Sequence, residues 1–236
     1  MQNDIINTVR NELKLNSSAA VRLSAKKFFK EEAKHYGVKS AVVGEIAAKS
    51  FRDVESFGKK EIFSLCEELF MSDYSEEAYV ASDWAYRLRK DFKPEDFKIF
   101  ERWINSYINN WAKCDTFCNH TVGAFVELYP KYLKDLTIWA KSENRWVRRA
   151  SAVTLILPAR HGKFLKDVFE IADLLLTDQD DMVQKGYGWM LKAASEAHQR
   201  EVFQYVMKNK KAMPRTALRY AIEKMPQALR KSAMVK

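Results

Sequence analysis

Apolar residues return every three or four positions along most of this chain of 236 residues. The first segment shows the pattern, because Ile5, Val9 and Leu13 fall on one face of a helix that starts near Asp4. No stretch alternates apolar and polar residues as a strand does, and the chain has only 7 Gly and 5 Pro. The pattern therefore predicts an all-α protein.

Capping residues in the turns predict where the next helices begin and end. Ser18 is a predicted N-cap for a second helix that reaches Ala33, because its hydroxyl can accept a hydrogen bond from the first helical turn. Gly37 is a predicted C-cap in the turn that follows, since glycine adopts the left-handed conformation at little cost. A third helix is expected over residues 40–50.

From Gly58 onward the pattern predicts helices in pairs. Prolines fall at their edges, where a missing N–H does least harm. The expected pairs are 59–71 with 75–90, 94–108 with 111–129, 131–142 with 144–157, 163–176 with 180–195, and 198–209 with 214–225.

The second helices of the later pairs repeat a short motif. The stretch 147–152 is Val-x-Arg-Ala-x-Ala, and 183–188 is Val-x-Lys-Gly-x-Gly, 36 residues later. The stretch 217–220, Ala-x-Arg-Tyr, follows after 34 more. A period near 36 built from helix pairs is typical of an α-solenoid of HEAT-like repeats, in which small residues let neighbouring helices approach closely. One domain over residues 1–236 is predicted.

The net charge of +9 is unevenly distributed. Residues 1–130 hold 19 Lys and Arg against 20 Asp and Glu, whereas residues 131–236 hold 21 against 11. Because repeat proteins bind with their concave face, the basic residue of each repeat predicts a positively charged groove for a polyanion such as nucleic acid. A basic surface that only faces solvent is the alternative.

Several function classes find little support in the sequence. No apolar run approaches a membrane span, and the polar start lacks the core of a signal peptide. Cys66, Cys114 and Cys118 are interpreted as reduced thiols of a cytoplasmic protein. The spacing of Cys114, Cys118 and His120 lacks a fourth zinc ligand, and the four His residues occupy unrelated contexts. No metal, no cofactor and no catalytic triad is therefore expected.

The first candidate site is the stretch from Trp111 to Asp115. A spacing of four puts the indole and the carboxylate on one helical face, which continues to Cys118 and Val122. A carboxylate with such apolar neighbours has three interpretations: a helix N-cap, a buried acceptor, or a functional group.

Two further candidates lie in the basic half. Trp189 points away from the apolar stripe of its helix, at the spacing of Lys185 and Lys192, which suits stacking on a ligand or packing on the next repeat. Arg149 lies at the flank of its stripe, and Arg148 points more directly to solvent. A guanidinium fork there suits a phosphate or a surface salt bridge, for instance to Glu143 in the case of Arg149.

These residues carry a resemblance that spans nearly the whole chain. Trp111-x-x-x-Asp115, Asn144-x-Trp146-x-x-Arg149 and the stretch 183–191, together with the turn His35–Lys39, resemble the bacterial AlkD-type DNA alkylation repair glycosylases. The chain departs from that family at Ala41, where proline is frequent, and at Lys39, where the type member has glutamine.

The resemblance implies excision of N3- and N7-alkylated purines, such as 3-methyladenine and 7-methylguanine, from duplex DNA during base excision repair. It makes Asp115 the catalytic carboxylate, with Trp111 and Trp189 flanking the lesion. It also makes Arg149 a phosphate contact, and it implies that no pocket for a flipped base is needed.

Contacts to DNA are also expected from four basic residues, Arg148, Arg149, Lys185 and Lys39, the last beside the undamaged side of the lesion. The expected partner is double-stranded DNA with alkylated purines, bound by a monomer away from any membrane. Two alternatives stay open: a DNA-binding repeat protein without activity, and a scaffold for other proteins. Salt-dependent binding to duplex DNA would separate the scaffold from the other two.

Overall fold

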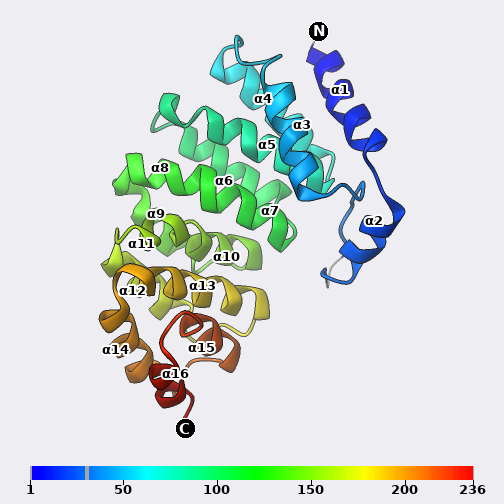
Figure 1. Ribbon diagram of the computed structural model, residues 1–236. Coiled ribbons are helices and arrows are strands. Elements are labelled where there is room, and N and C mark those ends of the chain that lie inside the picture. The colour runs from blue at the N-terminus through cyan, green and yellow to red at the C-terminus, as the bar shows by residue number, and fades with distance from the viewer. Residues whose placement is uncertain (1, 30–31, 236) are drawn as a thin grey trace. The chain divides into compact units, whose positions relative to one another are not determined.

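The computed structural model describes residues 2–29 and 32–235, and within these ranges its regular elements are all helices (Figure 1). The one extended pairing described there is an isolated bridge between Lys34 and Tyr74. The all-α prediction is therefore confirmed. The chain forms two compact units, Met1–Phe117 and Cys118–Lys236, and the expectation of one domain stays a prediction. No helix in the described ranges is long and apolar enough to cross a membrane.

The first unit stacks its helices in neighbouring rows. Helix α5 packs on α3 and α7 along one row, and α4 packs on α1 and α6 along the other. Phenylalanine and tryptophan side chains from α4 and α6 meet edge to face within the second of these rows, and the ring centroids of Phe63 and Trp103 lie 5.5 Å apart. The elements are α1 (Gln2–Leu15), α2 (Ala19–Lys26), α3 (Ser40–Phe51), α4 (Lys59–Met71), α5 (Ser75–Arg87), η1 (Arg89–Asp91), α6 (Asp96–Tyr107) and α7 (Trp111–Thr116).

The segment after α1 differs from the prediction. Ser18 does cap α2, since its hydroxyl accepts from Val21 N at 3.5 Å. The helix ends at Lys26 and not at Ala33, and the predicted part at residues 30–31 lies outside the described residues. Just past this helix Phe29 stacks on Trp111 of α7, with ring centroids 5.2 Å apart, so tertiary packing directs the segment away from the predicted helix. Gly37 consequently follows no helix, so its assignment as a C-cap is wrong.

The second unit follows the predicted pairs with smaller changes. Helix α13 packs on α10 and α15 in one row, and α12 packs on α9. Two short helices replace the predicted 144–157, and α16 follows a turn at Pro226 where no helix was predicted. The elements are α8 (Gly123–Leu128), η3 (Pro130–Tyr132), α9 (Leu133–Trp139), α10 (Arg145–Val153), α11 (Ile156–Arg160), α12 (Leu165–Leu174), α13 (Asp181–Ala197), α14 (Gln199–Asn209), α15 (Arg215–Ala221) and α16 (Gln227–Met234). Between α7 and α8 lies the π-helical turn η2 (Phe117–Val122).

The small residues of the repeat permit the close packing that the sequence predicts. A Cβ atom added to Gly188 would lie 2.7 Å from Tyr220 Cβ and 2.8 Å from the carbonyl oxygen of Ala217, both on α15. A Cβ atom on Gly186 would lie 3.2 Å from Arg149 Cγ on α10. Glycine at these two positions therefore lets α13 approach both neighbours of its row.

Candidate functional site

A cavity of about 460 Å³ lies within the first unit. Its walls come from α2 and the segment behind it, the turn before α3, and the first turns of α5 and α7. The lining combines aromatic and aliphatic side chains with two carboxylates. Its aromatic and ionisable lining residues include Phe29, His35, Lys39, Glu76, Trp111 and Asp115.

Helix α7 is fixed from its buried side. Asn110 caps the helix by accepting from Lys113 N at 3.0 Å. The ammonium group of Lys113 is buried and donates to Asp73 Oδ1 at 2.6 Å, to the Asp73 carbonyl at 3.0 Å and to Asn109 Oδ1 at 2.9 Å. Burial lowers the pKa of Lys113, and the Asp73 carboxylate opposes that shift. This anchor sets the rotation of α7 and leaves its other face to the cavity.

Trp111 and Asp115 lie on that other face, as their spacing predicts. Both are partly exposed and both line the cavity. The Trp111 ring stacks on Phe29, with centroids 5.2 Å apart and planes 17° from parallel. Asp115 lies inside α7, whose cap is Asn110, so the interpretation of Asp115 as an N-cap is wrong.

The turn before α3 is built around one carboxylate. Glu76 accepts backbone N–H groups from Tyr36 at 3.1 Å, from Gly37 at 2.9 Å and from Val38 at 3.2 Å. Gly37 has a φ of 88°, and a Cβ atom there would lie 2.6 Å from the Ser18 carbonyl oxygen, so glycine is required. This carboxylate cradle fixes the turn against the first residues of α5.

The same turn presents Lys39 and His35 to the cavity. Lys39 is exposed, precedes α3 and lines the cavity, and its contact with DNA stays a prediction. His35 was not predicted as a site residue. It lies in a turn, so its sequence position does not show which residues of other helices lie close to it. Its side chain is 9% exposed, its ring centroid lies 4.6 Å from that of Phe29, and its Nδ1 lies 3.8 Å from Glu76 Oε2. Burial lowers the pKa of His35, Glu76 raises it and Lys113 lowers it further.

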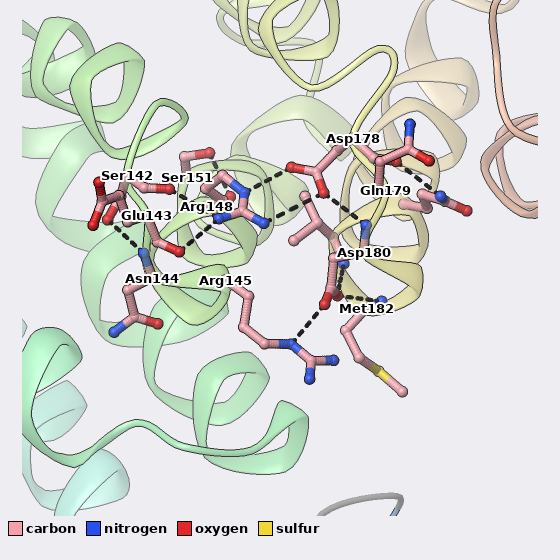
Figure 2. Close-up of polar contacts among 12 residues, drawn as sticks. Ser142, Glu143, Asn144, Arg145, Arg148, Ser151, Asp178, Gln179, Asp180 and Met182 are labelled. Atoms are coloured by element: carbon pink, nitrogen blue, oxygen red, sulfur yellow. Dashed lines mark hydrogen bonds and ion pairs between the residues drawn. The ribbon is translucent and has the colours of Figure 1, made fainter.

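Arg148, in the second unit, holds two turns together (Figure 2). Its Nε donates to Asp178 Oδ2 at 2.7 Å, and its Nη1 donates to the carbonyls of Ser142 and Glu143 at 2.9 Å each. Beside it, Arg145 forms an ion pair with Asp180 at 2.8 Å. The expectation that Arg148 points to solvent is therefore wrong, because loop acceptors surround its guanidinium group.

Arg149 is buried and does not lie at an exposed flank of the apolar stripe of α10, where its spacing predicted it. Its side chain lies between α10 and α13, and its Nη1 donates to the Met182 carbonyl. Only 4% of the residue is exposed. The missing side chain of Gly186 makes room for it, as the 3.2 Å approach to Arg149 Cγ shows. The sequence pattern predicted too much solvent exposure for Arg149. The spacing of residues within α10 cannot show that the facing residue of α13 is Gly186, which has no side chain.

The candidate site residues on α13 are more exposed to solvent than Arg149. Trp189 is partly exposed, whereas the stripe beside it is buried, so the predicted rotation of α13 is confirmed. Lys185 forms an ion pair with Asp181 at 2.7 Å, with 29% of its side chain exposed. Lys192 pairs with Glu223 at 3.0 Å and lies over the Tyr220 ring. The basic residues of successive repeats therefore occupy unlike environments, since Arg149 is buried and Arg219 is exposed.

The three cysteines are buried and form no disulfide within the described residues. Among the described residues, no three His, Cys, Asp or Glu side chains gather closely enough to hold a metal ion. The ionisable groups in the lining of the cavity are two carboxylates, one imidazole and one exposed ammonium group.

Comparisons with known proteins agree with this architecture. No curated protein matches the sequence significantly. A solved structure described as a predicted DNA alkylation repair enzyme from Enterococcus faecalis has the same fold, with a TM-score of 0.79 at 17% identity. The match covers 90% of this chain and 98% of that chain. The sequence profile of the DNA alkylation repair enzyme family matches residues 9–225. The chain therefore belongs to the DNA alkylation repair enzyme family.

Proposed function

We propose that the chain is a DNA glycosylase that removes N3- and N7-alkylated purines from duplex DNA. One observation carries this proposal above all: the Asp115 carboxylate and the stacked Trp111 indole line one cavity on the same helix. A carboxylate beside an aromatic face suits a positively charged nucleotide. Membership in a family of alkylation repair enzymes supports the same substrate class.

The chemistry needs few groups. An N3- or N7-alkylpurine is a cation, so the glycosidic bond breaks with its electron pair moving to the base, which leaves neutral. Protonation of the leaving group is then unnecessary, in contrast to the paired carboxylates of most glycosidases. The sugar becomes oxocarbenium-like at C1′, and Asp115 stabilises that charge and orients the attacking water. Water adds its oxygen to C1′, and its proton is released to solvent.

The remaining candidates receive different roles. In this proposal Trp189 is the second indole against the lesion, and Lys185 and Lys39 contact phosphates, since all three are at least partly exposed. Arg148 and Arg149 are assigned to packing, because their guanidinium groups bond within the protein. The chain acts as a monomer in the cytoplasm and uses no cofactor.

A base-release assay tests the proposal. Purified protein is incubated with duplex DNA that contains one 7-methylguanine, and the released base is quantified by mass spectrometry beside a no-enzyme control and the same duplex without the lesion. Release well above the spontaneous rate is expected. Binding to duplex DNA without release would instead identify a DNA-binding repeat protein, and no binding at low salt would favour a protein scaffold.

A further inference from the structure

A second cavity, of about 360 Å³, lies in the second unit beside α16. Four residues of α16 line it at the spacing i, i+3, i+4 and i+7, so they share one helical face. These four are Gln227, Arg230, Lys231 and Met234. The end of α15 and the turn after it supply the remaining lining residues, Arg219, Ile222 and Glu223.

Hydrogen bonds to its last carbonyls hold α16 beside this cavity. Lys210, which follows α14, donates from Nζ to the carbonyls of Ser232 at 3.3 Å and Val235 at 2.8 Å. Arg215 on α15 donates from Nη1 to the Met234 carbonyl at 3.4 Å. The last carbonyls of a helix have no partner within it, so these two donors satisfy groups that would otherwise need water. The wall that α16 provides is therefore anchored to two neighbouring elements.

The cavity carries cations that no carboxylate neutralises. Arg219, Arg230 and Lys231 are exposed and, among the residues that the structure describes, form no ion pair. The carboxylate of the lining, Glu223, is bound by Lys192 on α13 at 3.0 Å. Like charges that share a cavity repel, and an anion placed between them removes that repulsion. The ligand that fits this charge is an anion.

Two apolar side chains lie among the cations. Ile222 is buried, Met234 is half-buried, and both line the cavity. Methionine adapts its shape to different apolar groups and is frequent at surfaces that bind peptides. The phosphate groups of DNA would use only the cations. A peptide can use both features, because its carboxylates can bind the cations while an apolar side chain fills the space beside Met234.

We propose that this cavity is a docking site for a protein partner, and that it binds a segment in which carboxylates flank an apolar side chain. Arg219, Arg230 and Lys231 bind the carboxylates, and Ile222 and Met234 contact the apolar side chain. This inference goes beyond the proposed function and does not depend on it, because none of the residues assigned to the reaction lines this cavity.

The test uses a fluorescein-labelled synthetic hexapeptide of two glutamates, two leucines and two aspartates, in that order. One matched peptide has serines in place of the leucines, and another has amides in place of the carboxylates. Each is titrated with the full-length chain and followed by fluorescence anisotropy. A labelled duplex DNA without a lesion is titrated in parallel.

Three variants are compared with the natural chain. Lys231→Glu reverses one charge of the cavity. Lys224→Glu, at an exposed position of the same unit outside the lining, makes the same change in net charge and is the matched control. Met234→Ser removes the apolar contact and leaves the backbone carbonyl that Arg215 binds. Circular dichroism verifies the fold of each variant.

The leucine peptide is expected to bind saturably, with a Kd on the order of 10–100 μM. Serines in place of leucines, or amides in place of carboxylates, should each weaken binding about tenfold. Lys231→Glu should weaken binding of the leucine peptide about tenfold and Lys224→Glu less than about twofold. Met234→Ser should weaken binding of the leucine peptide about threefold and leave the serine peptide unaffected.

A lack of saturable peptide binding below about 1 mM would overturn the inference. Equal losses for Lys231→Glu and Lys224→Glu, or equal binding of the leucine and serine peptides, would also overturn it. A loss of duplex affinity confined to Lys231→Glu, with peptide binding unchanged, would assign the cavity to DNA instead. Release of 7-methylguanine by Lys231→Glu should equal that of the natural chain, so the glycosylase proposal is tested separately.

Discussion

Two polar regions, one in each unit, place their charged side chains in different surroundings. Between α10 and α13 of the second unit, Arg148 and Arg149 are satisfied by acceptors from turns and helix ends. In the first unit, Asp115 is partly exposed and lines a cavity, beside Glu76, which accepts the N–H groups of the turn before α3. A charged residue at the expected spacing is thus a site residue only where the fold leaves it facing a cavity or solvent.

A capping turn that occurs twice supplies the acceptors in the region between α10 and α13. Ser142 and Asp178 each accept the N–H of the residue two positions on, at 3.2 Å and 2.8 Å. The next polar residue, Asn144 or Asp180, then caps the following helix. Since the two turns lie 36 residues apart, the same period that stacks the helices also brings Asp178 to Arg148. The arginine pair is therefore part of the repeat architecture.

The largest expected effect is a loss of activity when Asp115, in the first unit, is changed. Asp115→Asn keeps the size and hydrogen-bonding capacity of the side chain and removes its charge. Loss of one electrostatic stabiliser should lower the single-turnover rate of 7-methylguanine release by about 10²–10³-fold, with little change in duplex affinity or Tm. Rapid-quench assays, fluorescence anisotropy and calorimetry would measure the three quantities. Full activity in Asp115→Asn would refute the catalytic assignment.

At Arg149, in the second unit, a change is expected to lower stability and to leave DNA binding unaffected. Arg149→Ala removes a buried side chain and the hydrogen bond to Met182, which should lower the free energy of unfolding by about 2 kcal/mol. For a chain of this size that corresponds to a fall in Tm of roughly 4–8 °C. The dependence of duplex binding on salt should stay as in the natural chain. A reduced salt slope in the folded variant would instead show that Arg149 binds phosphate.

A smaller loss of stability is expected at Asp178, the carboxylate partner of Arg148. Asp178→Asn weakens a partly exposed ion pair and should cost about 1 kcal/mol, with base release unchanged. Urea denaturation followed by circular dichroism would measure it. Together with Asp115→Asn this variant forms a matched pair, since the same chemical change should affect activity in one unit and stability in the other.

Sequence patterns predicted the helices well and the site partly. The spacing of Trp111 and Asp115 was sufficient to place both on one face, because a helix converts a separation of four residues directly into proximity. The burial of Arg149 depends on Gly186, 37 residues away, and no local pattern reports it. His35 is likewise brought to Phe29 and Glu76 by tertiary packing, so its part in the cavity could not be predicted from the turn alone.

The smallest expected effect concerns Lys39, which is exposed at the start of α3 and lines the cavity. If it neutralises one phosphate, Lys39→Ala should reduce the slope of log K against log salt by about 0.9 and leave the free energy of unfolding within about 0.5 kcal/mol. Anisotropy titrations at four salt concentrations would determine the slope. Lys60→Ala, exposed in the same unit but outside the lining of the cavity, is the matched control and should leave the slope unchanged. Equal slopes for both variants would show that Lys39 does not contact the DNA. Trp111 and Asp115 would then be the remaining candidate site residues of the first unit.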